Sequence, residues 1–386
     1  MRDVALLAGI VAFVGLGVAL AARGGDDADT TPPVATSADS AAATSTQAPD
    51  GTSTEGGQVE EPAEEPPVDQ KVTIAAVGDM AMGRDGFLPA GGPESLFAGV
   101  SGLLRGDVVL GNLEQALTRS GVSKCAGGGA DCFAFRTPPS YAKALAGAGF
   151  TVLSVANNHA HDYGASGQDD TVAALKRAGL AYTGLIGQVT RLQEQPVRVA
   201  ALGFGFYSTA ESLLDIPRAA RLVERADRWA DVVLVTFHGG AEGSGASHVP
   251  RGMETYLGEQ RGDLRGFSHA VVDAGADLVV GHGPHVLRGM EWYKDRLIAY
   301  SMGNFVGNHT FSTDGGGGVS GVLRVTLRGD GSWVKGKLAP TALVGAGAAA
   351  RDPAERAHGV VRELSQDDFG RRAIRVSRTG ALSPPK

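Results

Sequence analysis

The stretch Ser154-Val-Ala-Asn-Asn-His-Ala-His-Asp-Tyr-Gly164 indicates which type of fold this chain adopts. An apolar run over residues 151–156 ends abruptly in Asn157, Asn158 and His159, and a helical pattern begins within a few residues. Such a strand carries polar side chains to its carboxyl-terminal edge, which is where open α/β sheets place their ligands. Because an isolated Asn-His pair usually belongs to a turn, the prediction depends on whether the same pattern recurs.

The pattern recurs at the ends of four other apolar runs. Together the five runs end in these polar residues: Asp79; Asn112 and Glu114; Asn158 and His159; His238; and His282 with His285. Apolar spacing predicts helices over residues 140–147, 169–178 and 261–274, and residues 321–327 alternate like an antiparallel strand. Strands that alternate with helices early in the chain, followed by short paired strands, predict an α/β sandwich of two sheets with flanking helices.

The residue types at these strand ends point to metal binding. Carboxylate, amide oxygen and imidazole are the ligands that suit borderline divalent metals, and the pattern does not select among Mn, Zn and Fe. Two metals bridged by one carboxylate would use about this many groups and could activate a water for an in-line displacement. A single histidine of this kind is usually a hydrogen-bonded loop residue, but five strand ends together favour a site for one or two divalent ions.

The N-terminal part of the chain predicts a location outside the cytoplasm. Residues 4–22 form an apolar run without a charge, so residues 1–23 are either a retained membrane anchor or a signal peptide. The first case gives a single-pass membrane protein with an extracytoplasmic domain, and the second gives a secreted protein. Residues 24–70 are rich in Ala, Thr, Pro and Glu, which predicts a disordered acidic tether. A folded domain over residues 71–345 and a polar C-terminal cap or tail over residues 346–386 follow.

The net charge and the two cysteines limit which binding partners and which cysteine chemistry are expected for this chain. The net charge of −7 and the lack of a basic stripe in the sequence argue against binding to nucleic acid. The two cysteines, Cys125 and Cys132, lie in a Gly-rich loop. A disulfide fits an extracytoplasmic location, whereas a metal pair is the less favoured alternative because the spacing does not suit a zinc knuckle.

The order of the motifs resembles that of a known family. The motifs are Gly78-Asp79, Asn112-Leu-Glu114, Asn157-Asn-His159 with Asp162 and Gly164, His238 with Glu242, Gly281-His-Gly-Pro-His285-Val286, and Tyr300-Ser-Met-Gly-Asn-Phe305. Over residues 72–327 this order resembles the poly-γ-glutamate capsule-synthesis (CapA-like) family, which is similar in fold and motif order to the calcineurin-like metallophosphoesterases. The resemblance implies a metallophosphoesterase-like domain.

The resemblance also implies roles for individual residues. One metal would take Asp79 and His285, the second would take Asn158, His238 and His282, and either Asn112 or Glu114 would bridge the two. His159 would stabilise the transferring group or protonate the leaving oxygen, with Asp162 orienting its ring. Arg84 and Arg136 are candidates to bind an anionic substrate, and a solvated surface position is the alternative for each.

One departure leaves the activity open. Phosphoesterases usually carry a histidine two residues after the first aspartate, and this chain has Ala81 there. The first hypothesis is therefore a metal-dependent hydrolase or transferase that acts on an anionic polymer or phosphoester of the cell envelope. The alternative is a non-catalytic accessory protein for a membrane polymer synthase or export complex. A third hypothesis is a module that binds polyanionic wall polymers through a basic patch of Arg84, Arg136 and Arg288.

Overall fold

The computed structural model describes residues 69–129, 132–194 and 197–386. The predicted anchor and nearly all of the predicted tether lie outside these ranges. Within them, no helix combines the length and the apolar character needed to cross a bilayer.

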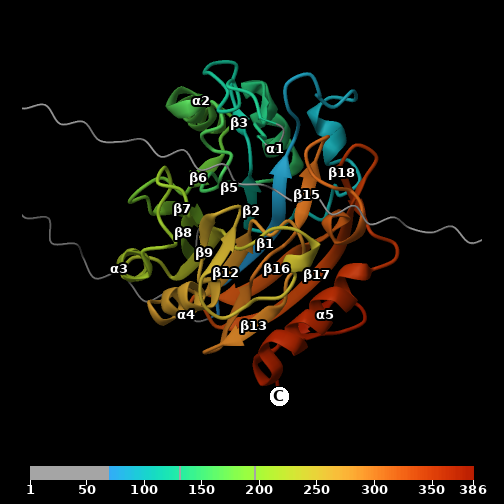
Figure 1. The fold of residues 1–386 in the computed structure, drawn as a ribbon. Coiled ribbons are helices and arrows are strands. Elements are labelled where there is room, and N and C mark those ends of the chain that lie inside the picture. The colour runs from blue at the N-terminus through green and yellow to red at the C-terminus, as the bar shows by residue number, and fades with distance from the viewer. Residues whose placement is uncertain (1–68, 130–131, 195–196) are drawn as a thin grey trace, which may run out of the picture. The chain divides into compact units, whose positions relative to one another are not determined.

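The larger sheet has a parallel half and an antiparallel half (Figure 1). Its strand order begins with β19 (Arg375–Val376), β20 (Ala381–Ser383), β17 (Trp333–Val344) and β16 (Val319–Arg328). It continues with β1 (Lys71–Ala81), β2 (Val108–Leu113), β5 (Val152–Ser154) and β6 (Ala181–Thr183). Two further strands join at the side, because β15 (Asn304–Gly307) pairs with β1 and β18 (Ala348–Arg351) pairs with β17. Strands β1, β2, β5 and β6 run parallel.

The second sheet has a parallel centre and antiparallel edges. Its order is β13 (Met290–Tyr293), β14 (Arg296–Ala299), β12 (Leu278–His282), β9 (Val232–His238), β8 (Val197–Gly205) and β7 (Thr190–Glu194). The four central strands are parallel, and β13 and β7 run antiparallel at the two edges. Two small pairs complete the strands: β3 (Ala116–Leu117) with β4 (Arg136–Thr137), and β10 (Glu254–Tyr256) with β11 (Glu259–Gly262).

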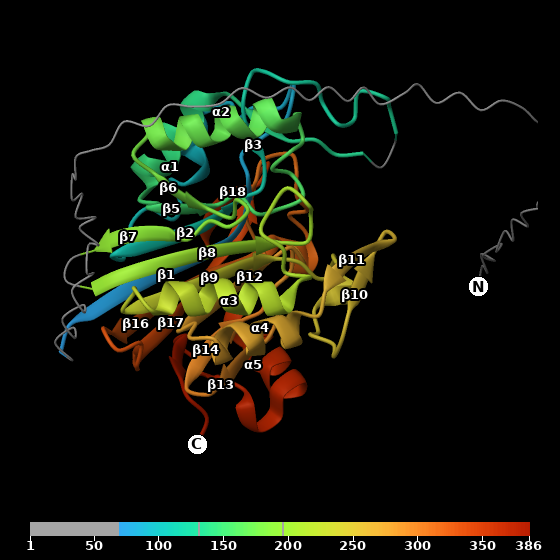
Figure 2. The same ribbon diagram turned by 90° about the vertical axis from the view of Figure 1, so that its left-hand side faces the viewer.

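Three apolar layers hold the sheets and helices together. Side chains from both sheets, including Ile74 and Val280, fill the space between the sheets. Helices α1 (Ala142–Ala148) and α2 (Gly164–Arg177) cover the outer face of the larger sheet, and α3 (Ile216–Asp227) and α4 (Leu264–Asp273) cover that of the second (Figure 2). Because β1 is buried on both faces, its sequence is a continuous apolar run rather than an alternating one. The predicted two-sheet α/β sandwich with flanking helices is confirmed.

Helix α3 is not among the helices expected from apolar spacing, although its sequence carries the start signals of a helix. The side chain of Asp215 caps the helix by accepting a hydrogen bond from the Arg218 amide at 3.1 Å. A proline follows in the first turn, and Ala219, Leu222 and Val223 form its buried face.

The C-terminal segment differs from the expected cap or tail over residues 346–386. Strands β18 and β20 both pair with β17, and β19 extends the sheet beyond β20. Helix α5 (Arg356–Phe369) contributes Ala357 and Val361 to the layer between the sheets. Ala357, Val361 and Leu364 stand at helical spacing, which fits α5, but the charged residues around them do not indicate that the segment packs into the core.

Replacing Ile374 tests this placement. Ile374 is 2% exposed and lies in the layer between the sheets, so Ile374→Ala removes a packed side chain. We expect the free energy of unfolding, measured in denaturant, to fall by about 2–5 kcal/mol. The matched control is Glu363→Ala on the exposed face of α5, which should change it by less than about 0.5 kcal/mol. Equal stability of the two variants would mean that the segment is peripheral.

Candidate metal centre

Strand ends from both sheets meet at one buried cluster. In the larger sheet Asp79 on β1 is in register with Asn112 on β2, and in the second sheet His238 on β9 is in register with His282 on β12. Glu114 follows β2 directly. The side chains of Asp79, Glu114 and His238 are fully buried. Parallel strands place their carboxyl ends at one edge, which is why these groups from distant parts of the sequence converge.

Close approach of two strands fixes the position of Asp79. A Cβ atom at Gly78 would lie 1.8 Å from the carbonyl oxygen of Gly303, so only glycine allows β1 and the turn before β15 to approach this closely. The Asp79 amide donates to that same carbonyl at 2.8 Å. The glycine before Asp79 is therefore required by packing.

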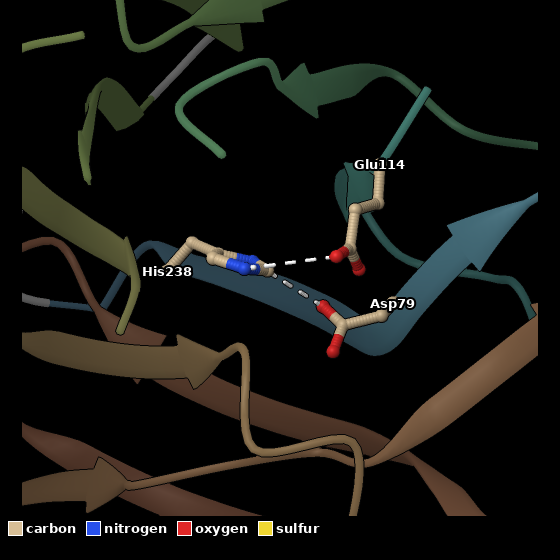
Figure 3. Close-up of side chains that lie close together, drawn as sticks. All are labelled: Asp79, Glu114 and His238. Carbon is tan, nitrogen blue, oxygen red and sulfur yellow. Dashed lines mark ion pairs between the residues drawn. The ribbon is translucent and has the colours of Figure 1, made fainter. Parts of the chain in front are cut away.

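Asp79, Glu114 and His238 form the centre of the cluster (Figure 3). Each offers one ligand-type atom, and these atoms lie within 4.8 Å of one another. His238 Nδ1 lies 3.9 Å from Asp79 Oδ1, and His238 Nε2 lies 3.7 Å from Glu114 Oε1. The group could therefore hold a metal ion.

Two further histidines complete the surroundings of the carboxylates. Nδ1 of His282 lies 3.4 Å from Asp79 Oδ1, and Nδ1 of His285 lies 3.2 Å from Asp79 Oδ2. Nε2 of His285 also lies 3.5 Å from Glu114 Oε1. The backbone of His285 has φ of 59°, an unusual value for a non-glycine residue, and this conformation is part of the turn that carries the imidazole back to Asp79.

Several buried polar atoms of the cluster have no hydrogen-bond partner among the described residues. They are both carboxylate oxygens of Glu114, Nε2 of His238 and both ring nitrogens of His282. Outside this group, Oδ1 of Asn158 has no partner either. A buried polar atom without a partner costs about 1–3 kcal/mol, so five in one place require an explanation. All five atom types are ligands of divalent transition metals, and the residues present therefore fit such an ion.

The pKa shifts show how strongly these groups act on one another. Burial raises the pKa of Glu114 well above its ordinary value, against the effect of His285. For Asp79 burial acts in the same direction, but the imidazoles of His282 and His285 outweigh it and hold its pKa well below the usual range. Burial lowers the pKa of His238 well below its ordinary value, whereas the Glu114 and Asp79 carboxylates outweigh burial at His285 and raise its pKa to about 10.

Asn112 has its hydrogen-bonding groups engaged by protein neighbours. Its amide nitrogen donates to Asp79 Oδ1 at 2.8 Å, and its amide oxygen accepts from Asn157 Nδ2 at 3.0 Å. Glu114, by contrast, has both oxygens without a partner. Of the two candidates for a bridging ligand, the arrangement supports Glu114. Asn157 orients Asn112 and was not predicted as a site residue, although it stands next to Asn158.

His159 borders the cluster and is held from the opposite side. Its Nδ1 lies 2.7 Å from Asp162 Oδ2, its ring stacks on Phe135 at 4.2 Å, and its Nε2 lies 3.9 Å from Glu114 Oε1. Burial lowers the pKa of His159, against the raising effect of Asp162. Asp162 in turn accepts a hydrogen bond from the Phe135 amide at 2.6 Å and pairs with Lys124 Nζ at 2.6 Å.

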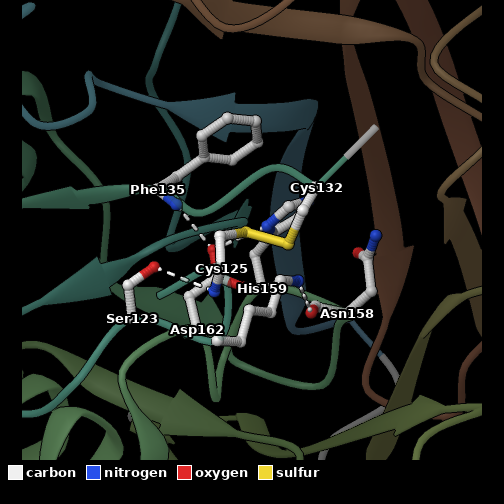
Figure 4. Close-up of a disulfide and its surroundings, with 8 residues drawn as sticks. Ser123, Cys125, Cys132, Phe135, Asn158, His159 and Asp162 are labelled. Carbon is white, nitrogen blue, oxygen red and sulfur yellow. Dashed lines mark hydrogen bonds and ion pairs between the residues drawn. A yellow bond between two sulfur atoms is a disulfide. The ribbon is translucent and has the colours of Figure 1, made fainter. Parts of the chain in front are cut away.

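The disulfide loop delivers Lys124 to this pair. Cys125 and Cys132 are bonded, and the bond lies beside His159 and Asp162 (Figure 4). Besides its ion pair, Lys124 donates from its backbone amide to the Asp162 carbonyl at 2.8 Å and from Nζ to the Asn158 carbonyl at 3.2 Å. The loop therefore orients two of the candidate site residues from outside the sheets.

A cleft of about 830 Å³ borders the cluster, and His285 is the imidazole of the cluster that lines it. Its walls include His159, His285 and Asn158 on the metal side, and Glu242, Arg261 and Tyr207 on the side of the β10–β11 hairpin. That hairpin projects from the body of the molecule (Figure 2). Arg261 was not predicted as a site residue because it lies outside every motif. Its guanidinium pairs with Glu242 at 2.7 Å and with Glu259 at 2.9 Å.

The arginines selected from the sequence lie elsewhere. Arg84 and Arg136 do not line the cleft and instead line a separate small pocket. Arg288 cannot belong to a surface basic patch with them, because it is fully buried and bonds both oxygens of Glu254 at 2.8 and 2.9 Å. Its role is to anchor β10, and with it one wall of the cleft.

The fold and the cluster define a class of protein: an α/β sandwich of two sheets with a buried carboxylate–imidazole centre where parallel strands of both sheets end. The family model described as "Bacterial capsule synthesis protein PGA_cap" matches residues 73–309, so the chain belongs to this family. The resemblance found in the sequence motifs is thereby confirmed.

The names of two relatives agree with this assignment. The chain is 33% identical to the "Capsule biosynthesis protein CapA" of Bacillus anthracis over 61% of this chain and 60% of that protein. It is 31% identical to the "PGA biosynthesis protein CapA" of Bacillus subtilis over 65% of this chain and 67% of that protein. A solved 5'-nucleotidase precursor from Thermus thermophilus aligns with 77% of this chain and 59% of its own at 15% identity and a TM-score of 0.38, values too low to transfer an activity.

Removing one imidazole tests the metal centre. We expect His238→Ala to lose most of the divalent metal that the purified full chain binds, because Nε2 is a buried ligand atom that no described protein group satisfies. Metal at about a hundredfold excess over its Kd should stabilise the wild type by about 2.7 kcal/mol and the variant far less. Metal analysis and thermal unfolding with and without a chelator measure both effects.

A matched histidine provides the control. His248 is exposed, with 63% of its side chain accessible, and it pairs with Asp368 away from the cluster. His248→Ala should keep the metal content and the metal-dependent stabilisation. If His238→Ala also kept both, the buried cluster would not be a metal centre.

Proposed function

We propose that this protein acts in the synthesis of a capsule or polyglutamate-type polymer as a metal-dependent hydrolase or transferase on an anionic substrate of the cell envelope. The observation that carries the proposal is that His285 lines the cleft and lies 3.5 Å from Glu114, whose two buried carboxylate oxygens have no partner among the described residues. A purely structural cluster would satisfy these atoms within the protein. The names of the relatives, which refer to capsule, PGA and polyglutamine synthesis, supply the biological setting.

The ligands of the ion are proposed from the geometry. Asp79, Glu114 and His238 would hold it, with His282 and His285 beside them and Asn158 offering an amide oxygen. A bound divalent ion would supply Lewis acidity toward a phosphoryl or carbonyl oxygen and lower the pKa of a water molecule. These six residues would supply the ligands for one ion or for two. Ala81, at the position where phosphoesterases usually carry a histidine, supplies none.

His159 is the group that would move a proton. Oδ2 of Asp162 accepts a hydrogen bond from the Phe135 amide and lies 2.7 Å from Nδ1 of His159, and its Oδ1 pairs with Lys124, so this arrangement favours the tautomer in which Nδ1 of His159 donates to Asp162. Nε2 of the neutral ring is then an acceptor at the edge of the cleft, 3.9 Å from Glu114. In this position it can take a proton from an attacking group or return one to a leaving oxygen.

A second candidate is a non-catalytic accessory role. Two observations favour it: Ala81 stands where phosphoesterases usually have a histidine, and one relative, from Mycobacterium tuberculosis, is called a "probable polyglutamine synthesis accessory protein". In this case the metal centre would stabilise a cleft that binds the polymer or a component of its synthase or export complex. Membrane tethering by residues 1–23, with the folded domain outside the cytoplasm, belongs to both proposals.

A comparison of two histidine variants tests the catalytic proposal. The full chain loaded with Mn, Zn or Fe would be assayed against a generic phosphodiester and against γ-linked polyglutamate. We expect turnover by the wild type, none by His238→Ala, and a loss of about 10²–10⁴-fold in His159→Gln, which keeps its metal because His159 is not a ligand.

The same variants separate the two candidates. A metal-loaded wild type without turnover on either substrate contradicts the catalytic proposal for these substrates. Polymer production in cells would then be measured for each variant. If His238→Ala stops production while His159→Gln sustains it, the metal centre has the accessory role.

A further inference from the structure

Three arginines surround a small pocket outside the cleft of about 830 Å³ that borders the buried cluster, here called the metal cleft. The pocket has a volume of about 210 Å³, and Arg84, Arg119 and Arg136 line it together with a single acidic residue, Asp85. Its walls thus carry an excess of two positive charges in a protein whose net charge is −7. A local basic site on an acidic chain is a candidate for binding an anion.

Arg84 is held in place from two sides. It begins a tight turn in which Arg84 and Phe87 exchange backbone hydrogen bonds, and Gly86, with φ of 79°, allows the turn to close. The guanidinium lies over the Phe87 ring at 4.1 Å, and its Nε donates to the His309 carbonyl at 3.0 Å. Among the described residues these contacts use only Nε, so the Nη groups remain available as donors.

Arg136 is held in the same manner on β4. Its guanidinium lies over the Tyr163 ring at 4.3 Å, and its Nε donates to Asp85 Oδ1 at 2.6 Å. Tyr163 also donates to the second oxygen of Asp85 at 3.1 Å, so the carboxylate is bound from both sides. Arg119 is exposed on the segment that follows β3. Two of the three guanidinium forks are therefore preorganised for an oxyanion, which reduces the entropy lost on binding.

The same two segments of the chain border both the pocket and the metal cleft, and they form a partition between them. Phe135, the residue before Arg136, lines the cleft and stacks on His159. On the other side, the His309 carbonyl binds Arg84, and the next residues, Thr310 and Phe311, line the cleft. The segments around Phe135 and Thr310 therefore contribute to the cleft and also carry or contact an arginine of the pocket, so they lie between the two.

We propose that this pocket, here called the arginine subsite, binds a carboxylate or phosphate group of a polyanionic chain, another part of which occupies the metal cleft. The second half of this inference rests on the proposed function, whereas anion binding by the arginine subsite does not. A chain long enough to reach across the partition gains from both sites, because the second contact is intramolecular. The protein therefore favours polymers over single anionic units.

Binding measurements on metal-free protein test the arginine subsite separately from catalysis. The full chain in chelator would be titrated with glutamate, with γ-linked polyglutamate of increasing length, and with polyphosphate. We expect salt-sensitive binding of polymer, weak binding of the single unit, and a loss of about two- to fivefold for each of Arg84→Gln, Arg119→Gln and Arg136→Gln. The triple variant should lose tenfold or more.

Matched controls keep the test decisive. Arg378→Gln removes an exposed arginine elsewhere and should leave binding unchanged. Arg119→Gln changes an exposed side chain, so its effect cannot be attributed to unfolding. Tighter binding of polyphosphate than of polyglutamate would support the arginine subsite and assign it to phosphate. Equal affinities of the triple variant and the wild type overturn the inference, as does binding that is equally weak for single units and polymers. Neither result bears on turnover at the metal centre.

Discussion

Two carboxylates, Asp79 and Glu114, lie fully buried among the imidazoles of His238, His282 and His285, and the rest of the molecule is arranged around this contact. A buried carboxylate without a hydrogen-bond partner destabilises a fold unless a cation or a proton compensates it. Asp79 is partly satisfied by Asn112 and by the Gly283 amide, whereas Glu114 is not satisfied by any described residue. This asymmetry makes Glu114 the strongest single indication of a metal at the site.

The apolar layers provide the stability that such a cluster requires. Parallel strands of two sheets deliver the ligand atoms, and each sheet is covered on its outer face by helices, so the strand ends are fixed from both sides. The C-terminal segment closes the layer between the sheets through α5 and β20. Binding energy from the ion would add to this framework, because metal binds only the folded arrangement.

Loops shape the cleft, and each is tied to the core by a charged contact. The disulfide loop reaches Asp162 through Lys124, and the β10–β11 hairpin is held by the buried pair of Arg288 and Glu254. Removing one partner of such a buried pair leaves a charge without compensation, which is costly. These contacts position the walls of the cleft without taking part in the metal centre itself, and they explain why Arg288 is unavailable to an anionic ligand.

The amino-acid sequence by itself determined the α/β class, the strand ends and the polar residues placed there. Local patterns suffice for this, because each apolar run and the Asp, Asn or His that ends it lie within a few residues of each other. Only the tertiary structure decided which of these groups are partnered: Asn112 is bound by Asn157, Glu114 is left without partners among the described residues, and Arg288 is withdrawn into the core. It also brought Arg119 beside Arg84 and Arg136, and it drew residues 346–386 into the sheet. Such outcomes depend on contacts between residues far apart in the chain, and no local periodicity or spacing records them.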